Sequence, residues 1–149
     1  MINTSDFIPD FTDEDLTSRH QKDFFYYYNK IKADRQIPSR SDINPADIVK
    51  ILPHLILIEK SRGKFTVRLM GTKCASVLGE RTGKSLNSID GSTEEIDRLT
   101  WSSDNKRPYF HKSLLDKISK KHVKSSAIVM PLSENNNDVN MFVAVHHFY

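Results

Sequence analysis

The segment 55–69 constrains the fold most, because it places two short apolar runs on either side of a polar turn. Residues 55–58 are too few for a solitary helix and too apolar for a loop, which predicts a buried strand. Residues 65–69 alternate apolar and polar side chains with a period of two, as half-buried strands do. Gly63 lies at the centre of the turn, so the two strands are predicted to form an antiparallel hairpin.

The segment before this hairpin predicts a helix from Asn44 to Pro53. Asn44 is a good N-cap, Pro45 takes the first helical position, where its missing N–H costs nothing, and Asp47 adds negative charge to the first turn. Pro53 ends the helix. Upstream, Pro38 disfavours helical backbone in the residue before it, so 37–42 is predicted to be extended and turn-like.

Further helices are predicted on both sides of this region. The helix over 18–35 carries an apolar stripe at i, i+3, i+4 and i+7, made of Phe24, Tyr27, Tyr28 and Ile31. A short helix over 73–78 is ended by Gly79. The helix over 92–102 begins with a capping box, in which the Ser92 hydroxyl and the Glu95 side chain bond each other's backbone N–H groups.

The last third of the chain predicts three more strands, at 109–116, 124–132 and 139–147. The polar residues 133–138 form the turn between the last two. The final strand is apolar on both faces, which favours a central place in the sheet. The periodicity therefore indicates an α+β chain.

Length and composition fit one domain, with 149 residues of which 38% are hydrophobic. We expect residues 1–18 to form a flexible leader, 19–52 the N-terminal helices and 53–149 the core. The formal charge of +3 favours no partner class, and the single cysteine excludes an intramolecular disulfide. Because the sequence shows no signal peptide and no membrane-spanning run, we expect a cytoplasmic protein.

Several short motifs carry a family resemblance. These are P-S-R-S-D-I-N-P from Pro38, L-P at Leu52, F-T-V-R-L-M-G-T ending at Thr72, the G-x-x-x-G turn from Gly79, and P-L-S from Pro131. Together they resemble a family of single-domain bacterial PAS proteins, common in alphaproteobacteria and once described as a domain of unknown function. That family has a leucine where this chain has Arg81.

The resemblance implies a five-stranded antiparallel sheet of order 2-1-5-4-3, with the middle helices on one face and an N-terminal helical extension. It also draws attention to motif residues, for which we predict structural roles: Pro38, Arg40, Asp42, Pro45, Pro53, Gly71, Gly79 and Gly83. An apolar cavity between sheet and helices would be lined by candidates from both layers: Phe65, Val67, Arg68, Leu69, Met70, Val77, Ile96, Leu99 and Trp101. Arg68 either meets an anionic ligand there or pairs with Asp42.

The residue pattern gives little support for a metal or cofactor site. No two histidines have the helical spacing of a zinc motif, so no metal site is predicted. Haem and flavin are not expected, since the pocket helices carry no histidine and the cysteine lacks the flavin-binding string. Cys74 is predicted to be a buried structural residue. The basic run at 117–124 lacks interleaved aromatic residues, so nucleic acid is not an expected partner.

The function predicted from this pattern is a stand-alone PAS-like sensory or adaptor domain, non-enzymatic, that acts by small-ligand binding or protein contacts. A signalling protein and a second copy are the expected partners. Dimer contacts are predicted on the N-terminal helix, at Phe24, Phe25, Tyr26 and Tyr28. Two alternatives stay open: a structural dimerisation module, and a pocket isomerase or hydratase using Asp42, Asp47 or Glu59 with His54 or His111.

Overall fold

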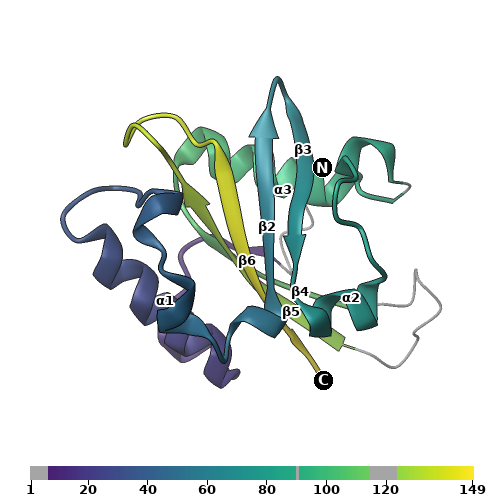
Figure 1. The fold of residues 1–149 in the computed structure, drawn as a ribbon, viewed down its shortest axis with the longest axis horizontal. Helices are drawn as coiled ribbons and strands as arrows, with labels where there is room; N and C mark the ends of the chain where they lie inside the picture. The colour runs from purple at the N-terminus through teal and green to yellow at the C-terminus, as the bar shows by residue number, and fades with distance from the viewer. Residues whose placement is uncertain (1–6, 90, 115–123) are drawn as a thin grey trace.

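The computed structural model describes residues 7–89, 91–114 and 124–149. One antiparallel sheet runs through the molecule (Figure 1). Its strands are β1 (Phe7–Ile8), β2 (Leu55–Ser61), β3 (Lys64–Met70), β4 (Tyr109–Leu114), β5 (Lys124–Leu132) and β6 (Met141–Phe148). The helices are α1 (Arg19–Lys32), α2 (Thr72–Leu78) and α3 (Thr93–Asn105), with 3-10 turns at Asp13–Asp15, Arg40–Asp42, Pro45–Ile48, Leu52–His54 and Leu86–Ser88.

The strand order is β1-β4-β5-β6-β2-β3. The five predicted strands follow the predicted order, with β6 in the interior, but the sheet has six strands instead of five. The sixth is β1, in which Phe7 lies opposite His111 and Ile8 opposite Phe110. Two residues are too short a run to leave a periodic signal in the sequence. The predicted strand 109–116 extends past Leu114 into residues outside the described part of the chain.

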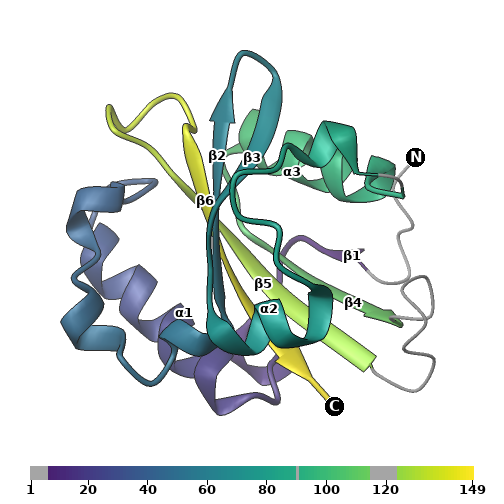
Figure 2. The same cartoon turned by 45° about the vertical axis from the view of Figure 1, so that its right-hand side comes forward.

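Helices cover both faces of the sheet: the middle helices lie on one face, as predicted, and the N-terminal helix covers the other. Figure 2 shows α1 on one side of the sheet, with α2 and α3 on the other. Because side chains alternate along a strand, neighbouring residues belong to different cores. The core under α1 includes Phe24, Tyr28, Leu57, Ile128, Val143 and Val145. The core under α2 and α3 includes Ile56, Ile58, Leu99, Val129, Phe142 and Ala144.

Cys74 lies in the second core and is fully buried, as predicted. Burial raises the pKa of its thiol to about 12, so the reactive thiolate is scarce at neutral pH. The segment predicted as a flexible leader also contributes to the core under α1, in which Phe11 and Leu16 are buried.

The predicted helix from Asn44 to Pro53 is wrong in type. Pro45–Ile48 and Leu52–His54 are separate 3-10 turns, in which amides bond the carbonyl three residues back, such as the Asp47 amide to the Asn44 carbonyl at 2.9 Å. The predicted Asn44 cap is present, because its side chain accepts from the Ala46 amide. A proline in each turn removes a backbone donor and so disfavours a continuous α-helix.

The capping box predicted at the start of α3 does not form. Ser92 has φ −90° and ψ 2°, outside the extended region in which an N-cap hydroxyl reaches the first-turn amides, and within the described residues its side chain makes no capping bond. Within that same part of the chain, no helix is long and apolar enough to cross a membrane.

Candidate functional site

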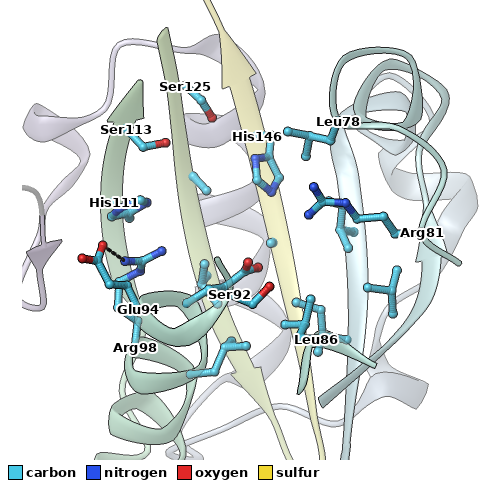
Figure 3. Close-up of a pocket in the computed structure, with 18 of the residues that line it drawn as sticks. Leu78, Arg81, Leu86, Ser92, Glu94, Arg98, His111, Ser113, Ser125 and His146 are labelled. Atoms are coloured by element: carbon cyan, nitrogen blue, oxygen red, sulfur yellow. Dashed lines mark ion pairs between the residues drawn. The ribbon is translucent and has the colours of Figure 1, made fainter. Parts of the chain in front are cut away.

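A cavity of about 720 Å³ lies between the sheet and the covering made by α3 and the segment after α2. Figure 3 shows its lining, with the strands as the floor. Its apolar lining includes Ile56, Ile58, Val67, Met70, Leu86 and Leu99. Its polar lining includes Arg81, Ser92, Arg98, His111, Ser125 and His146. The volume is typical of sites for small organic molecules.

Arg98 on α3 is the most deeply buried charged residue of the site, with 9% of its surface exposed. Its Nη1 lies 4.0 Å from a carboxylate oxygen of Glu94, whose side chain is 53% exposed. Its Nε has no hydrogen-bond partner among the described residues. An unpaired buried donor is costly, so this atom calls for a partner that the described chain does not supply.

His111 and His146 stand on the floor of the cavity, separated by a small residue. Both lie opposite Ala127 in the sheet, His111 on β4 and His146 on β6. The two histidine backbones are therefore two strand spacings apart, about 10 Å, with only a methyl group between them. This row leaves open space where a larger residue on β5 would fill it.

Both histidines are neutral at neutral pH. Burial lowers the pKa of His111 to about 3, and the nearby Arg98 acts in the same direction. Burial and Arg81 lower the pKa of His146 to about 4. Each ring therefore offers one donor and one acceptor. The Nδ1 of His146 is buried and unpaired within the described part of the chain.

Arg81 and Glu95 are further charged residues in the lining of the cavity. Arg81 reaches in from the wall opposite Arg98 and points toward His146 (Figure 3). Burial raises the pKa of the Glu95 carboxyl, while Arg98 and then Arg81 oppose that rise. The arrangement thus combines two guanidinium groups, two neutral imidazoles and a carboxyl of weakened acidity.

Comparison with known proteins assigns the family. A family model described as PAS domain matches residues 16–144. The chain belongs to the PAS domain family. PAS domains are typically sensory signalling domains without enzymatic activity, so this chain is a member of a sensory class. A search of curated proteins finds no significant match.

A search of solved structures finds matches, among them the structure of an RNA-binding light-oxygen-voltage receptor. The identity is 11% and the TM-score 0.47. The match covers 74% of this PAS chain and 35% of that receptor chain.

Three of the predicted pocket residues line the cavity of this PAS domain, namely Val67, Met70 and Leu99. Phe65 is buried beside Phe142. Ile96 and Trp101 pack against the second core, and Val77 is half-buried on α2. None of these four is among the described residues that line the cavity.

Arg68 and Leu69 lie outside the cavity. Leu57 on β2 pairs with Leu69 on β3, and the next residue of β2, Ile58, pairs with Val67. Arg68, between these two partners, is therefore the extra residue of a β-bulge. The bulge reverses the predicted alternation, and Leu69 is 42% exposed. Arg68 pairs with Glu59 at 3.4 Å, whereas Asp42 pairs with Arg35, so the predicted pair of Arg68 and Asp42 does not form.

The predicted motif residues form local turns away from the cavity. Asp42 accepts from the Ser39 amide at 2.8 Å and pairs with Arg35 at 2.9 Å, and the bond from the Ser39 amide is the main cause that lowers the pKa of its carboxyl. Arg40 donates to the Ile43 carbonyl, which is three residues along the chain. Pro38 is buried, and its carbonyl accepts from the Ser133 amide.

The remaining motif residues shape turns. Pro45 begins one 3-10 turn and Pro53 lies in the next. Gly79 and Gly83 both have φ +86°. Gly71 lies so close to the Leu52 carbonyl oxygen that a Cβ there would approach it to 2.2 Å, which only glycine avoids.

The four predicted interface residues do not form one surface. Phe24 and Tyr28 are 0% and 2% exposed, because α1 docks this stripe against the sheet, and the Tyr28 hydroxyl donates to the Pro131 carbonyl at 2.6 Å. Phe25 is half-buried against Phe11. Tyr26, with 73% of its surface exposed, is the one of the four that is open to a partner.

The predicted acid–base candidates are scattered, apart from His111. Asp42, Asp47 and Glu59 do not belong to the described lining, and His54 stacks on His20 with ring centroids 4.1 Å apart. Sequence reasoning missed Arg81, Glu95, Arg98 and His146 as site residues. A signal existed for two of them, since Glu95 and Arg98 are polar residues on the helical face that also carries Leu99.

Proposed function

We propose that this PAS domain senses a small molecule bound in the cavity between the sheet and α3, and passes the binding event on as a change in a protein contact. The observation that supports this most is the pair of unpaired buried atoms, Arg98 Nε and His146 Nδ1, at one 720 Å³ cavity. Buried polar groups normally have partners, and a ligand with oxygen acceptors and donors would supply them.

The contacts of α3 suggest a route for the signal. Trp101 meets the Phe7 ring edge-on, with centroids 5.1 Å apart, and Arg107 pairs with Asp10. Lys60 on β2 donates to the Ser103 hydroxyl at 2.6 Å. A ligand held by Arg98 would stabilise one position of α3 and thereby bias the N-terminal segment 7–10, since a ligand shifts a conformational equilibrium only through differential contacts.

Native mass spectrometry of the freshly purified chain, followed by denaturation, tests this proposal. We expect a bound species of small-molecule mass that is released on unfolding. A bare mass before and after unfolding, from several expression hosts, would contradict ligand sensing and favour the structural dimerisation module.

The protein contact itself is proposed at the exposed side of α1, where Tyr26 is the open aromatic residue. Light scattering at several concentrations would show whether a second copy binds there, because Tyr26→Ala should then shift the chain toward monomer. Tyr27, whose hydroxyl donates to Asp47, gives a matched control as Tyr27→Phe. An unchanged mass for Tyr26→Ala would exclude this surface as the dimer contact.

A second candidate function, a pocket isomerase or hydratase, is supported by Glu95 and His111, which both line the cavity. A carboxyl with a raised pKa and a neutral imidazole at one cavity are groups that proton transfer can use. Incubating the chain with its co-purified molecule in heavy water distinguishes the two functions. Deuterium uptake at a carbon atom, abolished in Glu95→Gln, would favour the enzyme, whereas no uptake would favour the sensor.

A further inference from the structure

We infer that the cavity takes a small molecule with a carboxylate head group and an apolar body, with the head at Arg98 and the body against β2 and β3. This inference rests on the proposed function and adds the chemical class of the ligand. It is carried by the unpaired Nε of the buried Arg98, by its weak pairing with Glu94 and by the change of polarity along the floor.

The start of α3 forms the head-group end of the cavity. Helical side chains tilt toward the N-terminus, which brings the Arg98 guanidinium beside the first turn, where Glu94 lies 4.0 Å away. Ser92 also lines the cavity, and its hydroxyl is free of the capping bond with the first-turn amides of the described helix. First-turn amides carry partial positive charge, and with the Arg98 Nε they offer several donors to one anion.

The lining includes two guanidinium groups, Arg81 and Arg98, and two carboxyls, Glu94 and Glu95. The Lys112 ammonium adds no charge to the cavity, because it lies 5.7 Å from the ring centroid of Phe110, which belongs to the core under α1. Glu94 neutralises Arg98 weakly, since their 4.0 Å contact is long and the Glu94 side chain is 53% exposed. Arg98 is therefore a buried and weakly paired cation at the cavity, and an anionic head group would pair with it.

The floor changes from polar to apolar along the strands. One cross-strand row pairs Ser113 with Ser125, and the next aligns His111, Ala127 and His146. The third row is mostly apolar, with Tyr109, Val129, Ala144 and Ile56. Beyond it, the paired residues Ile58 and Val67 continue the apolar lining, to which Leu86 also belongs. A ligand that matches this floor has one polar end and one apolar end.

A carboxylate fits the polar end better than a phosphate. The planar fork of an arginine matches a carboxylate with two parallel hydrogen bonds. Glu94 and Glu95 lie in the same first turn of α3 and would repel a dianion more strongly than a monoanion.

Four probes test the inference on the full chain by isothermal titration calorimetry: octanoate, octanol, octyl phosphate and acetate. We expect octanoate to bind at least tenfold more tightly than octanol and acetate, and more tightly than octyl phosphate. Amide chemical shifts in a ¹⁵N-labelled sample should move at His111, His146 and Leu99, which place the probe in the cavity.

Three variants test which arginine binds the carboxylate head group. Arg98→Met should weaken octanoate binding about tenfold to a hundredfold, because a charge-assisted hydrogen bond is lost, and leave octanol unchanged. Arg81 is a half-buried loop residue that is easier to replace, and Arg81→Gln should weaken octanoate binding about threefold to tenfold. Arg68→Gln is the matched control, since Arg68 is an exposed arginine outside the cavity, and should leave octanoate binding unchanged.

Each other result overturns the inference. Octanol binding as tightly as octanoate would exclude an anionic head, and tighter binding of octyl phosphate would replace carboxylate with phosphate. Failure of all octyl probes would exclude the amphipathic ligand. Ligand sensing is tested separately, because a co-purified molecule of another class would sustain the proposed function while the carboxylate inference fails.

Discussion

The two faces of the sheet differ in how they treat buried polar groups. Under α1 two large buried polar side chains, Gln21 and Tyr28, are both hydrogen-bonded. Gln21, fully buried, donates to the Ser126 hydroxyl at 3.2 Å and to the Val145 carbonyl at 3.1 Å, and Tyr28 donates to Pro131. This face has the properties of a core that holds the fold together.

The face under α3 has small residues on the floor and unpaired polar atoms around a cavity. Adjacent positions on β6 show the contrast, since Val145 is fully buried under α1 while His146 lines the cavity with an unpaired Nδ1. The same strands thus provide stability on one side and a binding site on the other. The two faces can therefore be changed independently by substitutions on alternate residues.

The largest effect is expected on the face under α1. Phe24→Ala should lower the free energy of unfolding by about 3–5 kcal/mol, because a fully buried ring is replaced by a cavity. Urea unfolding followed by circular dichroism measures this. Tyr26→Ala, on the exposed side of the same helix, should change stability by less than about 0.5 kcal/mol. Similar losses in the two variants would mean that α1 does not dock as described.

The cavity face should make stability depend on pH. The folded pKa values of His146 and His111, about 4 and about 3, lie below the ordinary value of 6.5. The unfolded chain therefore binds more protons between pH 6.5 and the folded values, so stability is full above pH 6.5 and is lost as the pH falls toward 4 and then 3.

His146→Gln should reduce this slope by up to about 1.4 kcal/mol per pH unit between pH 6.5 and 4. Glu95 gives a comparison of opposite sign, because its folded pKa is raised. Its contribution is present below its ordinary pKa of 4.5 and is lost as the pH rises through the folded value. Glu95→Gln should therefore gain stability relative to the parent chain as the pH rises above 4.5. Denaturation midpoints that fall in parallel for all three chains would contradict these assignments.

Replacing one buried polar group on each face should sharpen the contrast further. Gln21→Met should cost about 1–3 kcal/mol, since it leaves the Ser126 hydroxyl and the Val145 carbonyl without this donor. Arg98→Met should leave stability within about 1 kcal/mol, because a poorly paired buried charge is replaced by an apolar side chain of similar length. Thermal and urea unfolding of the two variants decide the point. A larger loss in Arg98→Met would mean that this guanidinium holds the fold together.

The strands could be predicted where apolar and polar residues alternate in the sequence or where apolar residues form a short run. Five segments show one of these patterns between turn residues such as Gly63, so their pairing as antiparallel strands could be inferred. The order of the strands came from the family resemblance. β1 could not be inferred, because Phe7 and Ile8 gain their structure from pairing with β4 and not from a pattern of their own.

The candidate site was less predictable, because its residues depend on details that leave no local pattern. The bulge at Arg68 moves that residue and Leu69 away from the cavity, and strict alternation cannot reveal an inserted residue. The pattern of Ser92 and Glu95 satisfies a capping box, yet Glu95 lines the cavity instead. Arg98 was overlooked because a charged residue on a helix is usually solvated, and its burial follows from tertiary packing.

The smallest effect is expected at the arginine that the sequence placed in the pocket. Arg68→Gln should change the free energy of unfolding by about 0.5 kcal/mol or less, since its pair with Glu59 is 3.4 Å long and more than half of the Arg68 side chain is exposed. Salt screens such surface pairs, so the difference should shrink further at 0.5 M NaCl in the same urea titration. A larger loss, unaffected by salt, would mean that Arg68 has a buried role and that the bulge of β3 belongs to the binding face after all.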